Sequence, residues 1–121
     1  MKKPTTTSKA ALKFGDVVVV PFPYADKLAD KRRPALVVSS NAFNARQSLL
    51  WVAMITSADS KPWPDDVGFP LKGTGLASAS VIRTSKIVTI ESARIVRVIG
   101  KIDKPSATNV SKIVSAILGK V

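Results

Sequence analysis

The chain of 121 residues contains no cysteine and no histidine, and these two absences exclude several kinds of site at once. Without cysteine there is no disulfide framework, as is typical of a cytoplasmic protein, and no thiolate that could act as nucleophile or metal ligand. Without histidine there is no imidazole acid, base or metal ligand. Any catalysis must therefore use carboxylates, hydroxyls, lysines and arginines, and we expect neither a metal nor another cofactor.

Long apolar runs and acidic residues are also scarce. No run of about 18 apolar residues exists, so we expect no membrane-spanning segment. Residues 1–13 are basic and lack the apolar centre of a signal peptide, which predicts a flexible segment before a single domain at 14–121. Nineteen Lys and Arg against eight Asp and Glu give a net charge of +11. This charge favours nucleic acid as a partner over an anionic membrane or an acidic protein, with a merely solubilising surface as the alternative.

β-branched and alternating apolar residues predict a chain built mainly of strands. Pro21 and Pro23 cannot donate to a ladder, so the end of the first strand should lie at a sheet edge or leave the sheet. We expect the third strand to be the most central, the fifth to be one bent strand or two short ones, and Gly73-Thr74-Gly75 to be a turn. Residues 41–48 read as a connecting turn or a single helical turn. The expected strands are 17–23, 34–40, 49–57, 67–71, 80–91 and 93–102.

The end of the chain changes to a helical period. Apolar residues recur there with the spacing of one helix face. Asp103 is a candidate N-cap, Pro105 fits the first turn, and Gly119 can close the C-terminus. Short strands followed by one helix predict a mainly β fold, a small curled antiparallel barrel with a C-terminal α-helix. The apolar positions are Val110, Ile113, Val114, Ile117 and Leu118.

Two arginines stand directly before a predicted strand, in the sequence KRRPALVVSS. Pro34 restricts Arg33 to an extended backbone, so the direction of this side chain is partly fixed. A guanidinium can donate two parallel hydrogen bonds to phosphate oxygens. The pattern therefore predicts that Arg33 binds phosphate, with Arg32 assisting electrostatically. The alternative is an ion pair of Arg33 with Asp16, Asp26 or Asp30.

Hydroxyl and cationic side chains occur at two further strand positions. Thr56 and Ser57 end the third strand, where side chains leave the core, although turn formation is the alternative role. Arg83 lies in an apolar strand segment, and strand alternation would place Ser85 on the same face. Arg83 could instead face solvent, and Asp65-Asp66 reads as a solvated acidic pair in a loop. Together the candidates predict a nucleic-acid phosphate site, with Lys86 beside them.

The segments GDVVVVPFPYADKLADKRRPALVVSS, WVAMITS and SVIRTSKIVTIE, in this order, resemble the MazF/PemK-type toxins of bacterial toxin–antitoxin pairs. The resemblance covers nearly the whole chain from Phe14 and includes RIVRVIGKI and the terminal helix. It implies an SH3-like barrel that forms a homodimer and cleaves single-stranded RNA without a metal. It also implies an acidic antitoxin partner, through which alone any operator DNA would be contacted.

Carried over residue by residue, the resemblance implies catalytic roles for Arg33, Thr56 and Arg83. Arg33 matches the arginine of the family's RP motif, and Thr56 matches the hydroxyl residue that closes the third strand. Arg83 matches an arginine that acts in catalysis in some members. Those members have Asp two residues later, where this chain has Ser85. Some have His in the first loop, where Tyr24 lies here, and others have Glu there, where this chain offers only Asp26 and Asp30. The general base is therefore unassigned.

RNA carries its own nucleophile, the 2′-hydroxyl, so cleavage needs positioning and charge stabilisation rather than an imidazole or a metal. The expected products are a 2′,3′-cyclic phosphate and a 5′-hydroxyl. Bases could stack on aromatic side chains such as Phe22, Tyr24 or Trp63. Two alternatives stay open: a nucleic-acid-binding barrel that has lost catalysis, as Ser85 suggests, and a gyrase inhibitor of the related CcdB type. The latter depends on a C-terminal end containing Trp, which ILGKV lacks.

Overall fold

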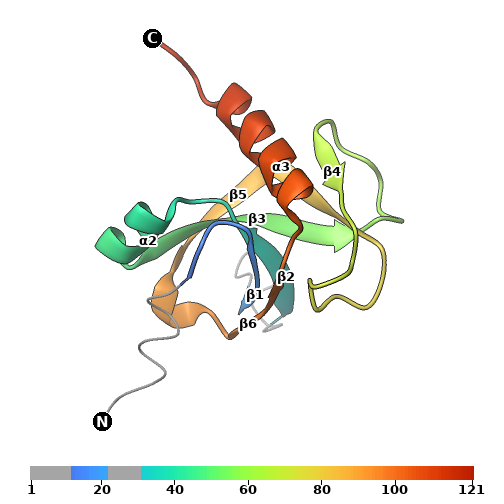
Figure 1. The fold of residues 1–121 in the computed structure, drawn as a ribbon, viewed down its shortest axis with the longest axis horizontal. Coiled ribbons are helices and arrows are strands. Elements are labelled where there is room, and N and C mark those ends of the chain that lie inside the picture. Colours follow the sequence, from blue (N-terminus) through green and yellow to red (C-terminus); the bar gives the residue numbers. More distant parts are fainter. Residues whose placement is uncertain (1–11, 22–30) are drawn as a thin grey trace.

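The computed structural model describes residues 12–21 and 31–121, so the expectations for 1–11 and 22–30, Tyr24 included, lie outside the described residues. The described part forms one six-stranded antiparallel sheet with the order β4-β5-β3-β2-β1-β6 and a long C-terminal helix (Figure 1). The predicted mainly β fold is confirmed. The elements are β1 Asp16–Pro21, β2 Arg32–Val37, α2 Asn41–Gln47, β3 Leu49–Ser57, β4 Asp66–Gly68, β5 Ser80–Glu91, a 3-10 turn Ser92–Arg94, β6 Arg97–Lys101 and α3 Lys104–Ile117.

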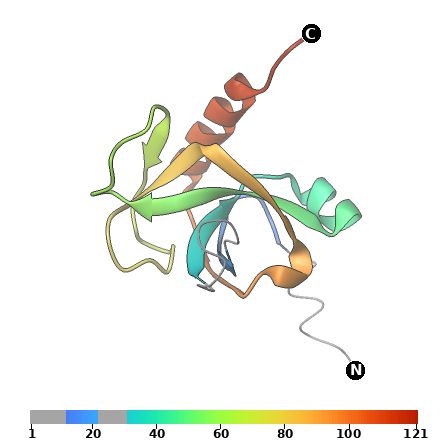
Figure 2. The same ribbon diagram turned by 180° about the vertical axis from the view of Figure 1, so that it is seen from behind.

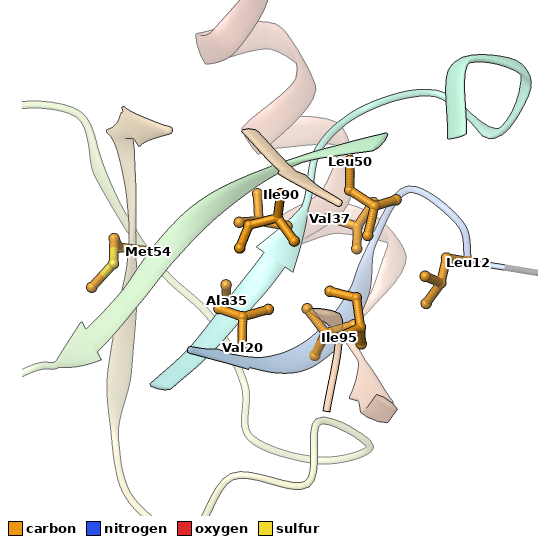
Figure 3. Packing of buried hydrophobic residues seen from close by; sticks show 10 residues of the cluster. Leu12, Val20, Ala35, Val37, Leu50, Met54, Ile90 and Ile95 are labelled. Carbon is orange, nitrogen blue, oxygen red and sulfur yellow. The ribbon is translucent and has the colours of Figure 1, made fainter. Parts of the chain in front are cut away.

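The sheet carries an apolar cluster on each face, because side chains of its central strands alternate. One cluster, here called the inner face, includes Val18, Ala35 and Met54, which occupy neighbouring positions on β1, β2 and β3. Figure 3 shows side chains of this cluster, Ala35 and Met54 among them. The other, here called the helix face, includes Leu36 and is covered by α3 through the fully buried Val110. Neither helix in the described residues has the length and apolar character needed to cross a membrane.

The predicted start of the second strand shifts, because pairing with β1, not propensity, decides where β2 begins. β2 begins at Arg32, two residues before Pro34, since Arg32 and Arg33 pair with Pro21 and Val20 of β1. Pro21 lies beyond the last residue pair between β1 and β6. The N–H that proline lacks is therefore not needed for a hydrogen bond between these two strands, as predicted. The segment predicted as one turn is the two-turn helix α2, capped by Ser40, whose hydroxyl accepts from the Phe43 N–H at 3.1 Å.

The terminal helix lies where its period predicts it, with Asp103 as N-cap and Pro105 in the first turn as predicted, but its C-terminal end differs. Asp103 occupies the N-cap position without a side-chain capping bond, and its Oδ1 is a buried oxygen with no hydrogen-bond partner. The helix ends at Ile117 with Leu118 as C-cap, whose N–H donates to the Val114 carbonyl. Gly119 therefore does not close the helix, because Leu118 returns to extended backbone before it.

β5 is one strand with a sharp bend, visible in the yellow-to-orange ribbon of Figure 2. Ala53 of β3 pairs with Ile87, while the next residue, Met54, pairs with Arg83. Residues 84–86 are therefore skipped in the register with β3 and form a bulge. The bulge interrupts alternation, so the prediction that Ser85 shares a face with Arg83 is wrong: Arg83 is buried and Ser85 is exposed.

The two edge strands of the sheet are bridged by the predicted turn at Gly73-Thr74-Gly75. The Lys101 N–H of β6 donates to the Gly73 carbonyl at 2.9 Å. Gly73 and Gly75 have φ of 81° and 79°, which favours glycine. A Cβ at Gly100 would lie 2.2 Å from the Gly73 carbonyl oxygen. Because no ladder pairs β4 with β6 in the described chain, the SH3-like barrel is loosely closed, with this turn lying between the two edges.

Candidate active site

Arg33 stands on the inner face at the entrance to β2. It pairs with Val20, and alternation along β2 places it on the same face as Ala35. The side chain is half-buried, since the sheet covers its stem. Among the described carboxylates none pairs with Arg33. Asp16 instead accepts a 2.9 Å hydrogen bond from the Lys13 N–H.

Thr56 lies near the end of β3 and is also half-buried. It is two residues beyond Met54 and therefore shares the inner face. Its Oγ1 lies 3.2 Å from the Oγ of Ser60, the third residue of the loop that follows β3. One hydroxyl donates to the other, so this contact orients the Thr56 hydroxyl while an oxygen lone pair remains for a ligand.

The sheet register indicates that Arg33 and Thr56 lie at facing positions. The last β2–β3 pair toward this end is Ala35 with Met54. Continuing the register by two residues places Arg33 opposite Thr56, with both side chains on the inner face. A guanidinium on the same face as an oriented hydroxyl is an arrangement that can bind a phosphate and stabilise charge that develops on it. In the described residues, no three acidic side chains come together as a metal-binding group.

Arg83 also belongs to the inner face, opposite Met54, but its guanidinium holds a loop. Its Nε donates to Asp66 Oδ1 at 3.2 Å and its Nη2 donates to Asp66 Oδ2 at 3.0 Å. Nη2 also donates to the Lys61 carbonyl at 2.8 Å. The two charged side chains are only 10% and 11% exposed. The structure thus places Arg83 next to the Arg33–Thr56 pair, with most of its donors committed to protein groups.

Asp66 is the residue that the sequence interpretation missed, because it was read as part of a solvated acidic pair. Its carboxylate is instead buried against Arg83 and pairs across the β4–β5 ladder. The hydrogen bond from Arg83 lowers the pKa of Asp66 from its usual 3.8, helped by the Trp63 N–H and opposed by partial burial. In the sequence, Asp66 is a single carboxylate in a segment that forms a strand of only three residues. Its partner Arg83 lies 17 positions further along the chain, and no local pattern links the two.

Asp66→Asn is expected to lower the free energy of unfolding at pH 7 by about 2–3 kcal/mol, because Arg83 would stay buried without its counter-charge. Since the pKa of Asp66 is lowered by folding, the ion pair stabilises the protein above about pH 4, and this contribution is lost as pH falls through the folded-state pKa. Urea unfolding of both proteins at pH 7 and near pH 2.5 should show the difference shrinking.

The matched control is Asp65→Asn, which changes the exposed neighbouring carboxylate. Asp65 has φ of 69°, which Asn also tolerates, so we expect a change within about 0.5 kcal/mol. An Asp66→Asn deficit of equal size at both pH values would contradict the ion-pair account.

The remaining predicted RNA-binding residues of the described chain lie outside the Arg33–Thr56 pair. Arg32 is exposed, and alternation turns it away from the face of Arg33. Ser57 is exposed, and its Oγ accepts from the Asp59 N–H at 3.1 Å, which is turn chemistry. Ser85 is exposed in the bulge, and Lys86 extends its Nζ to 5.7 Å from the centroid of the Trp63 ring.

A hollow of about 630 Å3 lies elsewhere, between α2, Trp51 and the last turns of α3. Its described lining contains no charged side chain, so it offers no cation to a phosphate. A second hollow, of about 600 Å3, lies beside the start of β1 and α3 and is lined by Lys13, Lys101, Lys104 and Lys112. Neither hollow is lined by Arg33, Thr56 or Arg83.

Solved structures with similar folds are MazF proteins and related endoribonucleases. MazF from Deinococcus radiodurans (Form-I) has a TM-score of 0.72 at 24% identity over 91% of this chain and 98% of that one. A MazE–MazF structure from the same organism (Form-II) gives 0.69 at 23% identity, covering 92% and 98%. An endoribonuclease in complex with its cognate antitoxin, from Mycobacterial species, gives 0.68 at 17% identity, covering 88% and 91%. These likenesses establish the fold.

Sequence comparison settles the family. No curated protein matches the chain in a sequence search. The family model for the PemK-like, MazF-like toxins of type II toxin–antitoxin systems, however, matches residues 13–118. This span contains all six strands, α3 and the inner-face site. The resemblance seen in the sequence is therefore confirmed: the chain belongs to the family of PemK-like, MazF-like toxins of type II toxin–antitoxin systems.

Proposed function

We propose that this toxin is an endoribonuclease that cleaves single-stranded RNA at specific sequences, without a metal, and thereby inhibits growth. The observation that carries the proposal is that Arg33 and Thr56 share the inner face on neighbouring strands, each two residues beyond the Ala35–Met54 pair. The net charge of +11 supports a polyanionic substrate. Two related folds are described as endoribonucleases, one of them in complex with its antitoxin.

In the proposed reaction, the 2′-hydroxyl of one nucleotide attacks the adjacent phosphorus. A P–O bond to that oxygen forms as the bond to the 5′-oxygen of the next nucleotide breaks. The 2′-hydroxyl proton leaves and the 5′-oxygen gains a proton, so the products are a 2′,3′-cyclic phosphate and a 5′-hydroxyl. Arg33 would donate two hydrogen bonds to the phosphoryl oxygens, where negative charge develops. Thr56 would hold a phosphate oxygen or orient the 2′-hydroxyl.

The proposed partners follow from the charge and the family. An acidic antitoxin would bind this strongly basic surface, and the hollow lined by four lysines supports an acidic ligand on the side of α3. Operator DNA would be contacted only through the antitoxin. A homodimer and a cytoplasmic location are part of the same proposal.

Thr56→Val, which replaces the hydroxyl by a methyl of similar size, is expected to slow cleavage about 10- to 100-fold. The loss is smaller than for a charged donor, because a neutral hydroxyl makes weaker hydrogen bonds. The measurement is the rate at which a 5′-labelled RNA of mixed sequence is shortened. Thr56→Ser should retain most of the rate, and Ser57→Ala serves as the neighbouring control.

The same assay tests the proposed function itself. Discrete fragments that depend on the protein would support an endoribonuclease. Intact RNA that is bound in a salt-sensitive manner would instead support a nucleic-acid-binding barrel without catalysis, for which the exposed Ser85 at the family's Asp position is the specific argument. A Thr56→Val variant as active as the parent would remove Thr56 from the site.

A further inference from the structure

The loop between β3 and β4 is fixed from beneath by two buried side chains of β5. Arg83 binds the Asp66 carboxylate and the Lys61 carbonyl. The next residue, Thr84, is fully buried and donates from Oγ1 to the Asp65 carbonyl at 2.8 Å. The β5 bulge places these adjacent residues where both contact the loop. The loop is therefore held in one conformation on the body of the sheet.

Trp63 lies in the loop that Arg83 and Thr84 hold. Its ring lies over the Arg83 guanidinium, 4.4 Å from Cζ to the ring centroid. Its backbone is closed into a turn: the N–H donates to Asp66 Oδ2 at 3.0 Å, and the carbonyl accepts from the Asp66 N–H at 3.3 Å. Even so, 40% of the residue remains exposed. A large aromatic ring is thus held against a paired guanidinium while part of the residue stays exposed to solvent.

The loop that carries this ring leads directly to the Arg33–Thr56 pair. The loop that carries Trp63 begins directly after β3, and Ser60 contacts the Thr56 hydroxyl at 3.2 Å. At its other end the loop is held by Arg83, which lies opposite Met54, two residues from Thr56 on the inner face. One loop therefore connects the candidate catalytic hydroxyl to the exposed ring. Lys86, with its Nζ 5.7 Å from the ring centroid, adds positive charge beside it.

An exposed aromatic ring flanked by cations is the combination that binds unpaired bases. A base stacks on the π-face while the cations attract the adjacent phosphates. We propose that Trp63 is the stacking surface for an unpaired base next to the scissile bond, and that Arg83 is a positioning residue that fixes Trp63 through Asp66. This assignment rests on the proposed single-stranded RNA substrate and gives the site a residue that influences which sequences are bound.

Such a role has a kinetic signature. Stacking exists before and during the chemical step, so its loss should raise KM and leave kcat nearly unchanged. Trp63→Ala should weaken RNA binding and raise KM about tenfold, while Trp63→Phe retains a π-face and should restore most of the affinity. If Arg83 acts through the ring, Arg83→Lys should also raise KM, and the double variant should be no worse than Trp63→Ala alone.

The test combines kinetics with fluorescence. Trp51 and Trp63 are the only tryptophans, so Trp51→Phe leaves Trp63 as the sole emitter. Trp51 is the matched control, because it is 38% exposed but packs edge-on against Phe43 beside α2. The probe is a mixed-sequence 2′-O-methyl RNA, which cannot be cleaved. We expect it to quench Trp63 in the Trp51→Phe protein, and we expect that protein to keep the parent KM.

The outcomes separate this inference from the proposed function. Quenching by the probe, with a raised KM for Trp63→Ala, supports the stacking surface. Quenching without any RNA cleavage by the parent protein also supports it, while the endoribonuclease proposal fails. Cleavage with an unchanged KM in a folded Trp63→Ala variant overturns the stacking surface while the proposed function stands. Additive losses in the double variant, with a lowered kcat for Arg83→Lys, would overturn the positioning role and make Arg83 a direct phosphate contact.

Discussion

Arg33→Ala is expected to lower the rate of RNA cleavage about 100- to 1,000-fold, the loss typical of removing one well-placed donor to a developing negative charge. The reason lies in the strand register. Arg33 is held on the inner face by its pairing with Val20, next to the expected position of Thr56, and Pro34 restricts its backbone. The measurement is single-turnover cleavage of a labelled RNA, with RNA binding determined in parallel.

Arg32 provides a matched control for this prediction. It precedes Arg33 by one residue, carries the same charge and is exposed on the other side of β2. Arg32→Ala should weaken binding modestly and reduce its salt dependence, with cleavage falling by less than about tenfold. Arg33→Lys keeps the charge but loses the planar guanidinium that can donate two parallel hydrogen bonds. Its cleavage rate should lie between those of Arg32→Ala and Arg33→Ala. Equal losses for Arg32→Ala and Arg33→Ala would show that only overall charge matters.

Gly100→Ala is expected to lower the free energy of unfolding by about 3 kcal/mol or more, although it adds a single methyl group. A Cβ at Gly100 would lie 2.2 Å from the Gly73 carbonyl oxygen and 2.6 Å from the Thr74 carbonyl carbon. Both are backbone atoms, which cannot swing aside as the end of a side chain can. The turn at 73–75 would have to leave β6, and the hydrogen bond from Lys101 to Gly73 would be lost with it.

Gly68→Ala is the control for that substitution. Gly68 also lies in a strand, but a Cβ there meets no atom within 4 Å. Adding the methyl should change stability by less than about 1 kcal/mol, with a small gain from a less flexible unfolded chain. Urea unfolding of the two variants gives the comparison. Similar losses for both would mean that the approach of the turn to β6 does not hold the barrel together.

The sequence predicted those parts of the fold that local patterns encode. The valines of β1 and the apolar run of β3 identify buried strands, and the 3.6-residue period identifies α3. The position of Arg33 at the strand entrance could also be predicted, because Pro34 marks it. These features need only neighbouring residues for their interpretation.

The rest depends on residues far apart in the chain. The strand β4 has three residues, too few for a periodic signal, so the partner of Arg83 could not be recognised. The three-residue bulge in β5 moves Ser85 out of the alternation expected from its position, and this bulge is visible only in the register with β3. Gly100 resembles any glycine in a strand until the 73–75 turn is seen to lie against it.

One measurement tests the central claim most directly: incubation of the purified protein with single-stranded RNA of mixed sequence in EDTA, followed by analysis of the fragment ends. The account predicts cleavage that survives EDTA, leaves 2′,3′-cyclic phosphate and 5′-hydroxyl ends, and is lost in Arg33→Ala. RNA that stays intact would contradict it, and so would cleavage that requires a divalent metal or leaves 5′-phosphate ends.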